Sequence, residues 1–144
     1  MNNVIRINHN DETLAIVIKA NYMKEGIEFF TPDDYSQQLA YMKHPQGKII
    51  LPHVHNEVKR QVHFTQEVLV IKSGKLRVDF YTQAKEYLES FMLEAGDVIL
   101  LASGGHGFEV IEDVEMFEIK QGPYAGENDK IRFDYQDREW LIKK

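Results

Sequence analysis

The chain has 144 residues, of which 43% are hydrophobic and 28% are charged, a balance typical of one folded globular domain and unlike a disordered chain. Its 23 acidic residues outnumber its 17 basic residues, so a net charge of −6 gives no basic field for a phosphate backbone, and we expect no nucleic-acid partner. The absence of cysteine excludes disulfides, thiolate metal sites and thiol nucleophiles.

The first ten residues interrupt every short apolar run with polar side chains, which fits neither a signal peptide nor a membrane span. We therefore expect a cytoplasmic protein with no membrane partner. No linker, repeat or low-complexity stretch divides the chain, so residues 1–144 are predicted to form one domain.

Short apolar runs closed by turn residues recur about every 8–12 residues, which is the spacing of all-β sandwiches and barrels. Residues 35–43 suit either a helical turn or a strand, and residues 122–144 are predicted to wrap the surface as a loop with one short element. In chain order, the predicted strands cover residues 14–20, 26–31, 47–55, 66–72, 76–81, 88–93, 98–102, 108–111 and 115–120.

Local signals add detail to this pattern. Pro45-Gln46-Gly47 is typical of a hairpin turn, and Ser73-Gly74-Lys75 supplies a turn at which glycine tolerates a positive φ. Residues 76–81 alternate apolar and polar side chains, which predicts that Arg77, Asp79 and Tyr81 face solvent. Four phenylalanines within apolar runs are predicted to lie in the core: Phe80, Phe91, Phe108 and Phe117.

His53-Val54-His55 ends a predicted strand, where alternation sends both imidazoles to the same face. Glu67 opens another predicted strand, and His106 follows the turn residues Ser103-Gly104-Gly105. Three imidazoles and one carboxylate would suit a divalent iron, manganese, nickel or zinc ion. The alternative is a metal-free polar interior in which these histidines are hydrogen-bonded pocket residues.

These residues resemble the two motifs of the cupin superfamily. The first motif places five residues between a glycine and His-x-His, as between Gly47 and His53, and six residues between a glutamate and a glycine, as between Glu67 and Gly74. The family has three or four residues between the second histidine and the glutamate. Here eleven residues separate His55 from Glu67, so we expect an extended hairpin over residues 56–65.

The second cupin motif is matched by Gly96 and Gly104, with Ala102 in place of the usual proline and His106 one position early. The resemblance implies an all-β cupin double-stranded β-helix, or jelly-roll barrel, with one divalent metal ion. The implied ligands of that ion are His53, His55, Glu67 and His106.

Three segments, Thr65–Leu69, Gly104–Phe108 and Lys120–Tyr124, look like those of small single-domain bacterial cupins of sugar-nucleotide and polysaccharide pathways. The resemblance implies a small polar substrate such as a sugar or sugar nucleotide, and an isomerase- or epimerase-like reaction in which Glu67 handles protons. An iron-dependent dioxygenase and a non-catalytic binding or sensor protein remain alternatives, because this fold hosts many functions.

Further residues carry weaker predictions. His63 is predicted to be solvated, whereas Lys59 and Arg60 either clamp a phosphate or carboxylate at the barrel mouth or are solvated. Tyr124 is predicted to cover the barrel end or to pack there.

The apolar runs at residues 4–7 and 14–18 exceed what the two motifs require, so a strand edge there predicts a homodimer.

Overall fold

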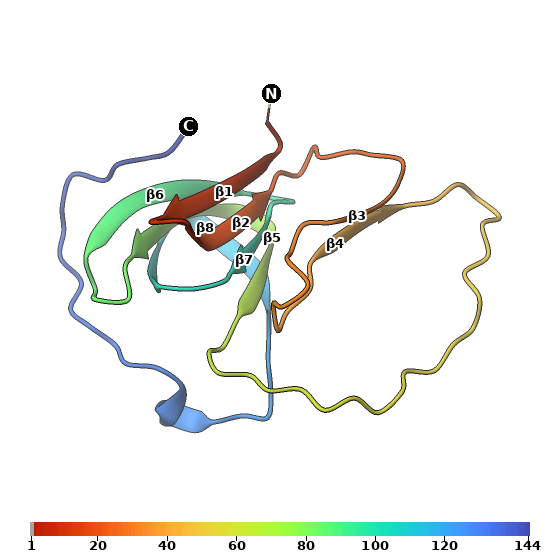
Figure 1. Ribbon diagram of the computed structural model, residues 1–144. Coiled ribbons are helices and arrows are strands. Elements are labelled where there is room, and N and C mark those ends of the chain that lie inside the picture. Colours follow the sequence, from red (N-terminus) through yellow and green to blue (C-terminus); the bar gives the residue numbers. More distant parts are fainter. Residues whose placement is uncertain (1) are drawn as a thin grey trace.

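The computed structural model describes residues 2–144, which fold into strands around one strongly curled antiparallel sheet (Figure 1). The strands follow the order β1-β2-β7-β5-β6, and β8 pairs with β5, whereas β3 and β4 form a separate two-stranded sheet. The elements are β1 (Val4–His9), β2 (Glu12–Ile18), β3 (Gly26–Phe29), β4 (Ala40–Lys43), β5 (Glu67–Tyr81), β6 (Tyr87–Glu94), β7 (Val98–Leu101), β8 (Gly105–Lys120) and the short 3₁₀ helix η1 (Gly126–Asp129).

Alternation along β2, β5 and β7 sends apolar side chains to both faces of the sheet. Ala15, Leu69 and Ile99 belong to the main core on the concave face, whereas their neighbours Ile16 and Val68 belong to a second cluster on the other face. The segment around β3 and β4 covers this second cluster with Tyr22, Phe30, Tyr35, Leu39 and Tyr41. The predicted all-β class is confirmed, and the curled sheet forms a half-barrel.

The two long strands β5 and β8 form a bent ribbon, with register shifts between residues 71 and 76 of β5. Gly74 lies within this bend at φ +88°, and a Cβ atom there would lie 2.0 Å from the carbonyl oxygen of Asp113 on β8. The prediction of a hairpin turn at residues 73–75 was therefore wrong. Glycine instead permits a bulge, at which one continuous strand bends and changes which face its side chains occupy.

Residues 44–64, which we call the arm, run outward from β4 before the chain returns to β5 (Figure 1). The turn after Pro45 forms, because the Lys48 N–H donates to the Pro45 carbonyl at 3.2 Å. The strand predicted for residues 47–55 and the hairpin predicted for 56–65 do not form in the described chain. No neighbouring strand edge is present to pair with the arm, and Pro45 and Pro52 lack the N–H donor that a ladder needs.

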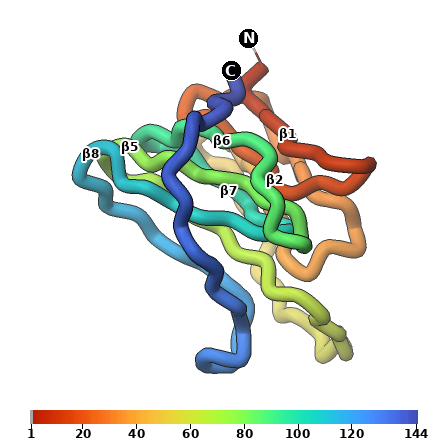
Figure 2. Tube along the Cα trace, turned by 90° about the vertical axis from the view of Figure 1, so that its left-hand side faces the viewer, coloured from red at the N-terminus to blue at the C-terminus, as the bar shows by residue number. Residues whose placement is uncertain are grey.

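The C-terminal segment crosses the outer side of the sheet, where Figure 2 shows it in dark blue. It is fixed to β6 at Ser90, whose N–H donates to the Leu141 carbonyl at 2.8 Å and whose carbonyl accepts from the Lys143 N–H at 2.8 Å. The predicted surface loop with one short element is confirmed by this segment and η1. As a result, Arg77 and Asp79 are only 4% and 1% exposed, so the prediction that they face solvent was wrong.

The packing corrects one further prediction and bears on another. Phe80 and Phe91 lie in the core as predicted, but Phe108 and Phe117 are exposed because β8 has no packed layer over it among the described residues. Residues 14–18 are buried in the chain's own core, whereas β1 is an edge strand of the sheet, so the strand edge on which we based the homodimer is present and the homodimer stays a prediction. No helix in the described part of the chain has the length and apolarity to cross a membrane.

Candidate functional site

Glu67 and His106 meet at the start of the two long strands. Glu67 is the first residue of β5, and His106 is the second residue of β8, directly after the turn that follows β7. The Nε2 atom of His106 lies 2.8 Å from Oε1 of Glu67, and both side chains are half-buried. The structure therefore brings together two of the four predicted metal ligands.

This contact favours the ionised form of Glu67. The hydrogen bond from His106 lowers the pKa of Glu67, against burial, which raises it, and the positive charges of His106, Lys120 and Lys130 add to the lowering. An ionised carboxylate can only accept a hydrogen bond, so Nε2 of His106 carries the proton that is shared with Glu67. Its Nδ1 atom is the ring nitrogen that this contact does not use.

Gln66 holds the start of β5 in place. Its side chain accepts from the Gln37 N–H at 3.1 Å and donates to the Ala102 carbonyl at 3.3 Å, while its backbone N–H donates to Oε1 of Gln121 at 2.8 Å. These bonds tie three separate segments to the residue next to Glu67. Buried bonds of this kind restrict the position of the neighbouring side chain.

His53 and His55 lie elsewhere, on the exposed arm. Their ring centroids are 5.3 Å apart, and Nδ1 of His53 lies 2.9 Å from the Leu51 carbonyl oxygen. Among residues 2–144, no three histidine, aspartate or glutamate side chains are grouped so that they could hold a metal ion. The predicted ligands are thus divided into two pairs, and within one chain they do not fit a metal centre.

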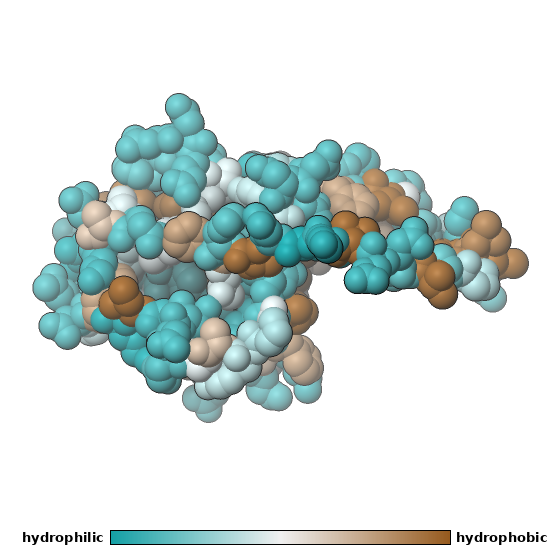
Figure 3. All heavy atoms as spheres, turned by 60° about the horizontal axis from the view of Figure 1, so that its bottom comes forward, coloured by the Kyte–Doolittle hydropathy of each residue, from teal (hydrophilic) through white to brown (hydrophobic). Residues whose placement is uncertain are grey.

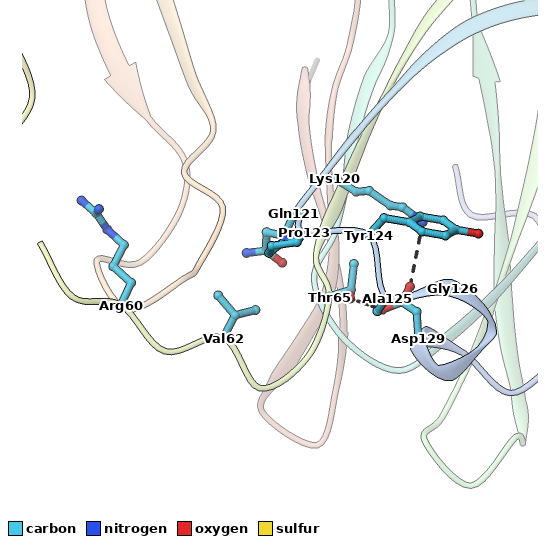
Figure 4. A pocket seen from close by; sticks show the side chains of 11 residues that line it. Arg60, Val62, Thr65, Lys120, Gln121, Pro123, Tyr124, Ala125, Gly126 and Asp129 are labelled. Atoms are coloured by element: carbon cyan, nitrogen blue, oxygen red, sulfur yellow. Dashed lines mark hydrogen bonds and ion pairs between the residues drawn. The ribbon is translucent and has the colours of Figure 1, made fainter. Parts of the chain in front are cut away.

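A cavity of about 370 Å³ opens where the arm, the end of β8 and η1 meet (Figure 4). Its lining includes Thr65 next to the start of β5, Lys120 at the end of β8, and Tyr124. Asp129 accepts a hydrogen bond from Thr65 and lies 3.9 Å from Nζ of Lys120, so it holds this wall together. Lys120 is also the ladder partner of Glu67, which places the cavity and the Glu67–His106 pair at the same end of the sheet.

The cavity also shows what the weaker predictions became and what sequence reasoning missed. Arg60 lines it but is exposed, so its role as a clamp stays a prediction, and Tyr124 lies against it and is largely exposed. His63 is exposed as predicted.

Sequence reasoning did not single out Gln121, yet its Nε2 atom is buried without a hydrogen-bond partner in the described structure. Only its position within the segment Lys120–Tyr124 could have drawn attention to it.

Comparison of the chain with protein-family models, with curated protein sequences and with solved structures finds no match.

Proposed function

We propose that the protein binds a small polar, anionic molecule at the open end of its half-barrel and transfers a proton on it with the Glu67–His106 pair. The resemblance to small bacterial cupins favours a sugar or sugar nucleotide as the substrate, and an isomerisation or epimerisation as the reaction. Under this proposal the chain is a cupin-like enzyme, and Glu67 and His106 are its catalytic residues.

One observation carries this proposal. The three segments that resemble those cupins are far apart in the sequence, but they meet around one site. Thr65–Leu69 contributes Glu67, Gly104–Phe108 contributes His106, and Lys120–Tyr124 lines the adjoining cavity. A cavity with a few convergent polar groups beside a hydrogen-bonded carboxylate and imidazole is the usual setting for acid–base chemistry.

The chemistry follows from the geometry of the pair. Glu67 holds the imidazole with Nε2 protonated, so that Nδ1 of His106 can accept a proton from a carbon next to a carbonyl group. The C–H electron pair forms a carbon–carbon double bond while the π pair of the carbonyl group moves to its oxygen. The ammonium group of Lys120, a cation at this end of the sheet, would stabilise that oxyanion. In an isomerisation, the neighbouring hydroxyl group gives its proton to this oxyanion, and His106 returns its own proton to the former carbonyl carbon. In an epimerisation, water supplies a proton to the other face of the carbon.

Proton exchange with solvent tests this proposal directly. The protein is incubated in D₂O with a panel of keto sugars and nucleoside diphosphate sugars, and deuterium incorporation next to the carbonyl is followed by NMR. We expect His106→Ala and Glu67→Gln to slow the exchange by about 10²–10⁴-fold, the usual contribution of a general acid or base. His9→Ala, which changes a histidine on β1, should leave the rate unchanged.

Two results would contradict the proposal. An exchange rate that His106→Ala does not alter would assign the proton transfer to another group. Saturable binding of a panel member without any exchange would favour the alternative of a non-catalytic binding protein.

A further inference from the structure

We propose that a second cavity, between the β5–β6 turn and the C-terminal segment, binds a small aromatic anion, that is, a planar ring that carries a carboxylate or phosphate group. The cavity has a volume of about 290 Å³ and shares no lining residue with the cavity at the end of β8. Its aromatic walls are Tyr81, Tyr87 and Phe133. The site is independent of the proposed function, because neither Glu67 nor His106 lines it.

This cavity lies on the outer face of the sheet. Tyr81 is the last residue of β5, Tyr87 is the first residue of β6, and the two are ladder partners. The preceding residue, Phe80, is buried in the main core, so alternation along the strand sends Tyr81 to the opposite face. The C-terminal segment crosses that face (Figure 2) and adds Phe133 to the wall.

The three rings form a corner. The ring centroids of Tyr81 and Tyr87 are 5.7 Å apart with an angle of 68° between the ring planes, and those of Tyr81 and Phe133 are 5.0 Å apart at 84°. Nearly perpendicular rings present both faces and edges to the space between them. A planar ligand ring can therefore stack on one ring and meet another in an edge-to-face contact, which are the two geometries that aromatic pairs prefer.

The charges of the lining favour an anion. Two cations, Lys85 and Arg138, face one carboxylate, Asp134. Nζ of Lys85 lies 6.0 Å from the ring centroid of Phe133, and Cζ of Arg138 lies 4.4 Å from that of Tyr87. Two of the three rings thus already hold a cation of the chain, so a cationic ligand would be repelled. A carboxylate or phosphate group would instead gain charge-assisted hydrogen bonds.

The backbone places Lys85 in the lining at a cost. Lys85 has a φ of +72°, in the left-handed region that glycine adopts most easily. The turn is fixed around it, because the Lys85 N–H donates to the Thr82 carbonyl at 2.9 Å and the Thr82 N–H donates to the Glu86 carbonyl at 2.8 Å. Non-glycine residues held in such conformations are concentrated at binding sites. The ammonium group at this position is consistent with a role in binding.

Tyr81 and Gln136 supply neutral donors. Burial raises the pKa of Tyr81, with the negative charge of Asp79 adding to the rise and the positive charge of Arg138 opposing it. The phenol therefore keeps its proton at neutral pH and can donate a hydrogen bond to an anionic group. The side-chain amide of Gln136, which also lines the cavity, has two further N–H donors.

The surroundings indicate a small molecule rather than a protein partner. Figure 3 shows the apolar groups, in brown, gathered mainly along the projecting arm, whereas the surface of the body is mostly hydrophilic, in teal. Protein docking sites are marked by broad apolar patches, whereas ligand sites are concave. A cavity of about 290 Å³ has room for one substituted ring of about ten non-hydrogen atoms.

Isothermal titration calorimetry with four compounds tests the ligand class. 4-Hydroxybenzoate and phenyl phosphate are aromatic anions, cyclohexanecarboxylate is an anion without an aromatic ring, and phenyltrimethylammonium is an aromatic cation. We expect a Kd of about 0.1–1 mM for at least one of the aromatic anions, which is typical of ligands of this size. The two other compounds should bind about 10-fold more weakly or less. The tighter of the two aromatic anions identifies the anionic group.

Substitutions in the lining test the location. Arg138→Gln and Phe133→Ala should each weaken binding of the aromatic anion by about 10-fold, because they remove a cation and an aromatic wall. Arg132→Gln is the matched control on the same segment, since Arg132 is exposed and forms an ion pair with Glu127 outside the cavity. Glu67→Gln should leave this affinity unchanged, so that failure of this proposal and failure of the proposed function are distinguishable.

Lys85→Gly separates binding from stability. The change removes the ammonium group but suits the φ of +72°, so it should weaken binding by about 10-fold without lowering the melting temperature. A purely structural lysine would give the opposite result, with a lower melting temperature and unchanged affinity.

Trp140 reports on the cavity from behind Tyr87, with their ring centroids 5.5 Å apart. Because it is the single tryptophan, its indole N–H gives one NMR signal, which should shift as 4-hydroxybenzoate or phenyl phosphate is added.

Three results would overturn the proposal. The first is that neither aromatic anion binds. The second is that cyclohexanecarboxylate or phenyltrimethylammonium binds as tightly as the aromatic anions, since recognition would then not require both the ring and the negative charge. The third is an affinity that falls in Lys120→Gln but not in Arg138→Gln, because the compound would then occupy the cavity at the end of β8.

Discussion

His106 contacts Glu67 although the β5–β8 ladder pairs Glu67 with Lys120 and His106 with Phe80. Residues 67 and 80 would be about 43 Å apart in a straight strand, at about 3.3 Å per residue. The 2.8 Å contact therefore shows that the sheet curls until the start of β8 meets the start of β5. The Glu67–His106 contact therefore depends on the curvature of the sheet.

The first prediction concerns the ionisation of Glu67. His106→Ala removes the hydrogen bond that lowers its pKa, while the burial that raises this pKa remains, so the pKa of Glu67 should rise. Titration of the carboxyl carbon by ¹³C NMR in both proteins measures the change. His9→Ala is the control and should leave the pKa of Glu67 unchanged.

The same pair makes a prediction about stability and pH. Because the folded-state pKa of Glu67 lies below its ordinary value of 4.5, the stabilisation is fully present above pH 4.5 and is lost as the pH falls through the folded-state pKa. His106→Ala should therefore lower the free energy of unfolding by about 1.5–3 kcal/mol at pH 7. Urea unfolding should show this difference shrinking below pH 4.5, and a constant difference would contradict the linkage.

The second prediction concerns the bend in β5. Gly74 and Gly47 have nearly the same φ, +88° and +87°, but a Cβ atom at residue 74 would collide with the backbone of Asp113, whereas one at residue 47 would meet nothing within 4 Å. Gly47→Ala should therefore cost only about 1 kcal/mol for its backbone conformation, and Gly74→Ala should cost about 3 kcal/mol or more. Urea unfolding of the two variants compares them, and equal losses would show that the close approach at Asp113 is not rigid.

The third prediction concerns the polar cluster under the C-terminal segment. Arg77 donates through Nε and NH2 to the two oxygens of Asp79, at 2.8 and 3.1 Å, and its guanidinium lies 3.7 Å from the ring centroid of Trp140. Asp79→Ala should destabilise the protein by about 3–5 kcal/mol, because it leaves a buried guanidinium without this partner. Arg77→Lys should also lower the melting temperature, since an ammonium group can neither bind in two places nor stack.

Trp140 is the single tryptophan of the chain, so its fluorescence reports on this cluster. We expect its emission to shift to the red in Asp79→Ala before the sheet unfolds, as measured by circular dichroism. Emission that changes only together with the sheet would indicate that the C-terminal segment does not depend on Asp79.

The fourth prediction concerns the cavity at the end of β8. Lys120→Gln should weaken binding of a nucleoside diphosphate sugar by about 10-fold, because it removes a cation from the lining. Isothermal titration calorimetry measures the affinity, with Lys24→Gln as the control at an exposed lysine outside the cavity. Equal affinities would place the anionic group elsewhere.

Much of the sheet could be predicted because its signals are local. The alternation in β5 identified Leu76, Val78 and Phe80 as core residues, and the predicted start of the strand at residue 66 lies one residue before its observed start at Glu67. The same alternation failed for Arg77, because its cover comes from Trp140, about sixty residues later in the chain. A period of two shows that two faces exist, but it cannot show what covers the second one.

The site could be predicted in part for a similar reason. Glu67 was identified at the opening of a predicted strand and His106 after the turn residues 103–105, and the structure joins them. Gln66 and Gln121 were missed, because their roles depend on hydrogen bonds between segments that only the fold brings together. The place of His53 and His55 in a metal site stays a prediction.

The curl of the β5–β8 ribbon also has a consequence for how the site arises during folding. Glu67 and His106 are separated by 39 positions and stand at opposite ends of the ladder, so their contact is non-local and must await closure of the whole ribbon. No isolated hairpin of this chain would present the site. Any molecule that binds both side chains therefore acts on the global folding equilibrium and raises the melting temperature of the whole sheet. A thermal-shift screen of unlabelled protein is thus sufficient to search for its ligand.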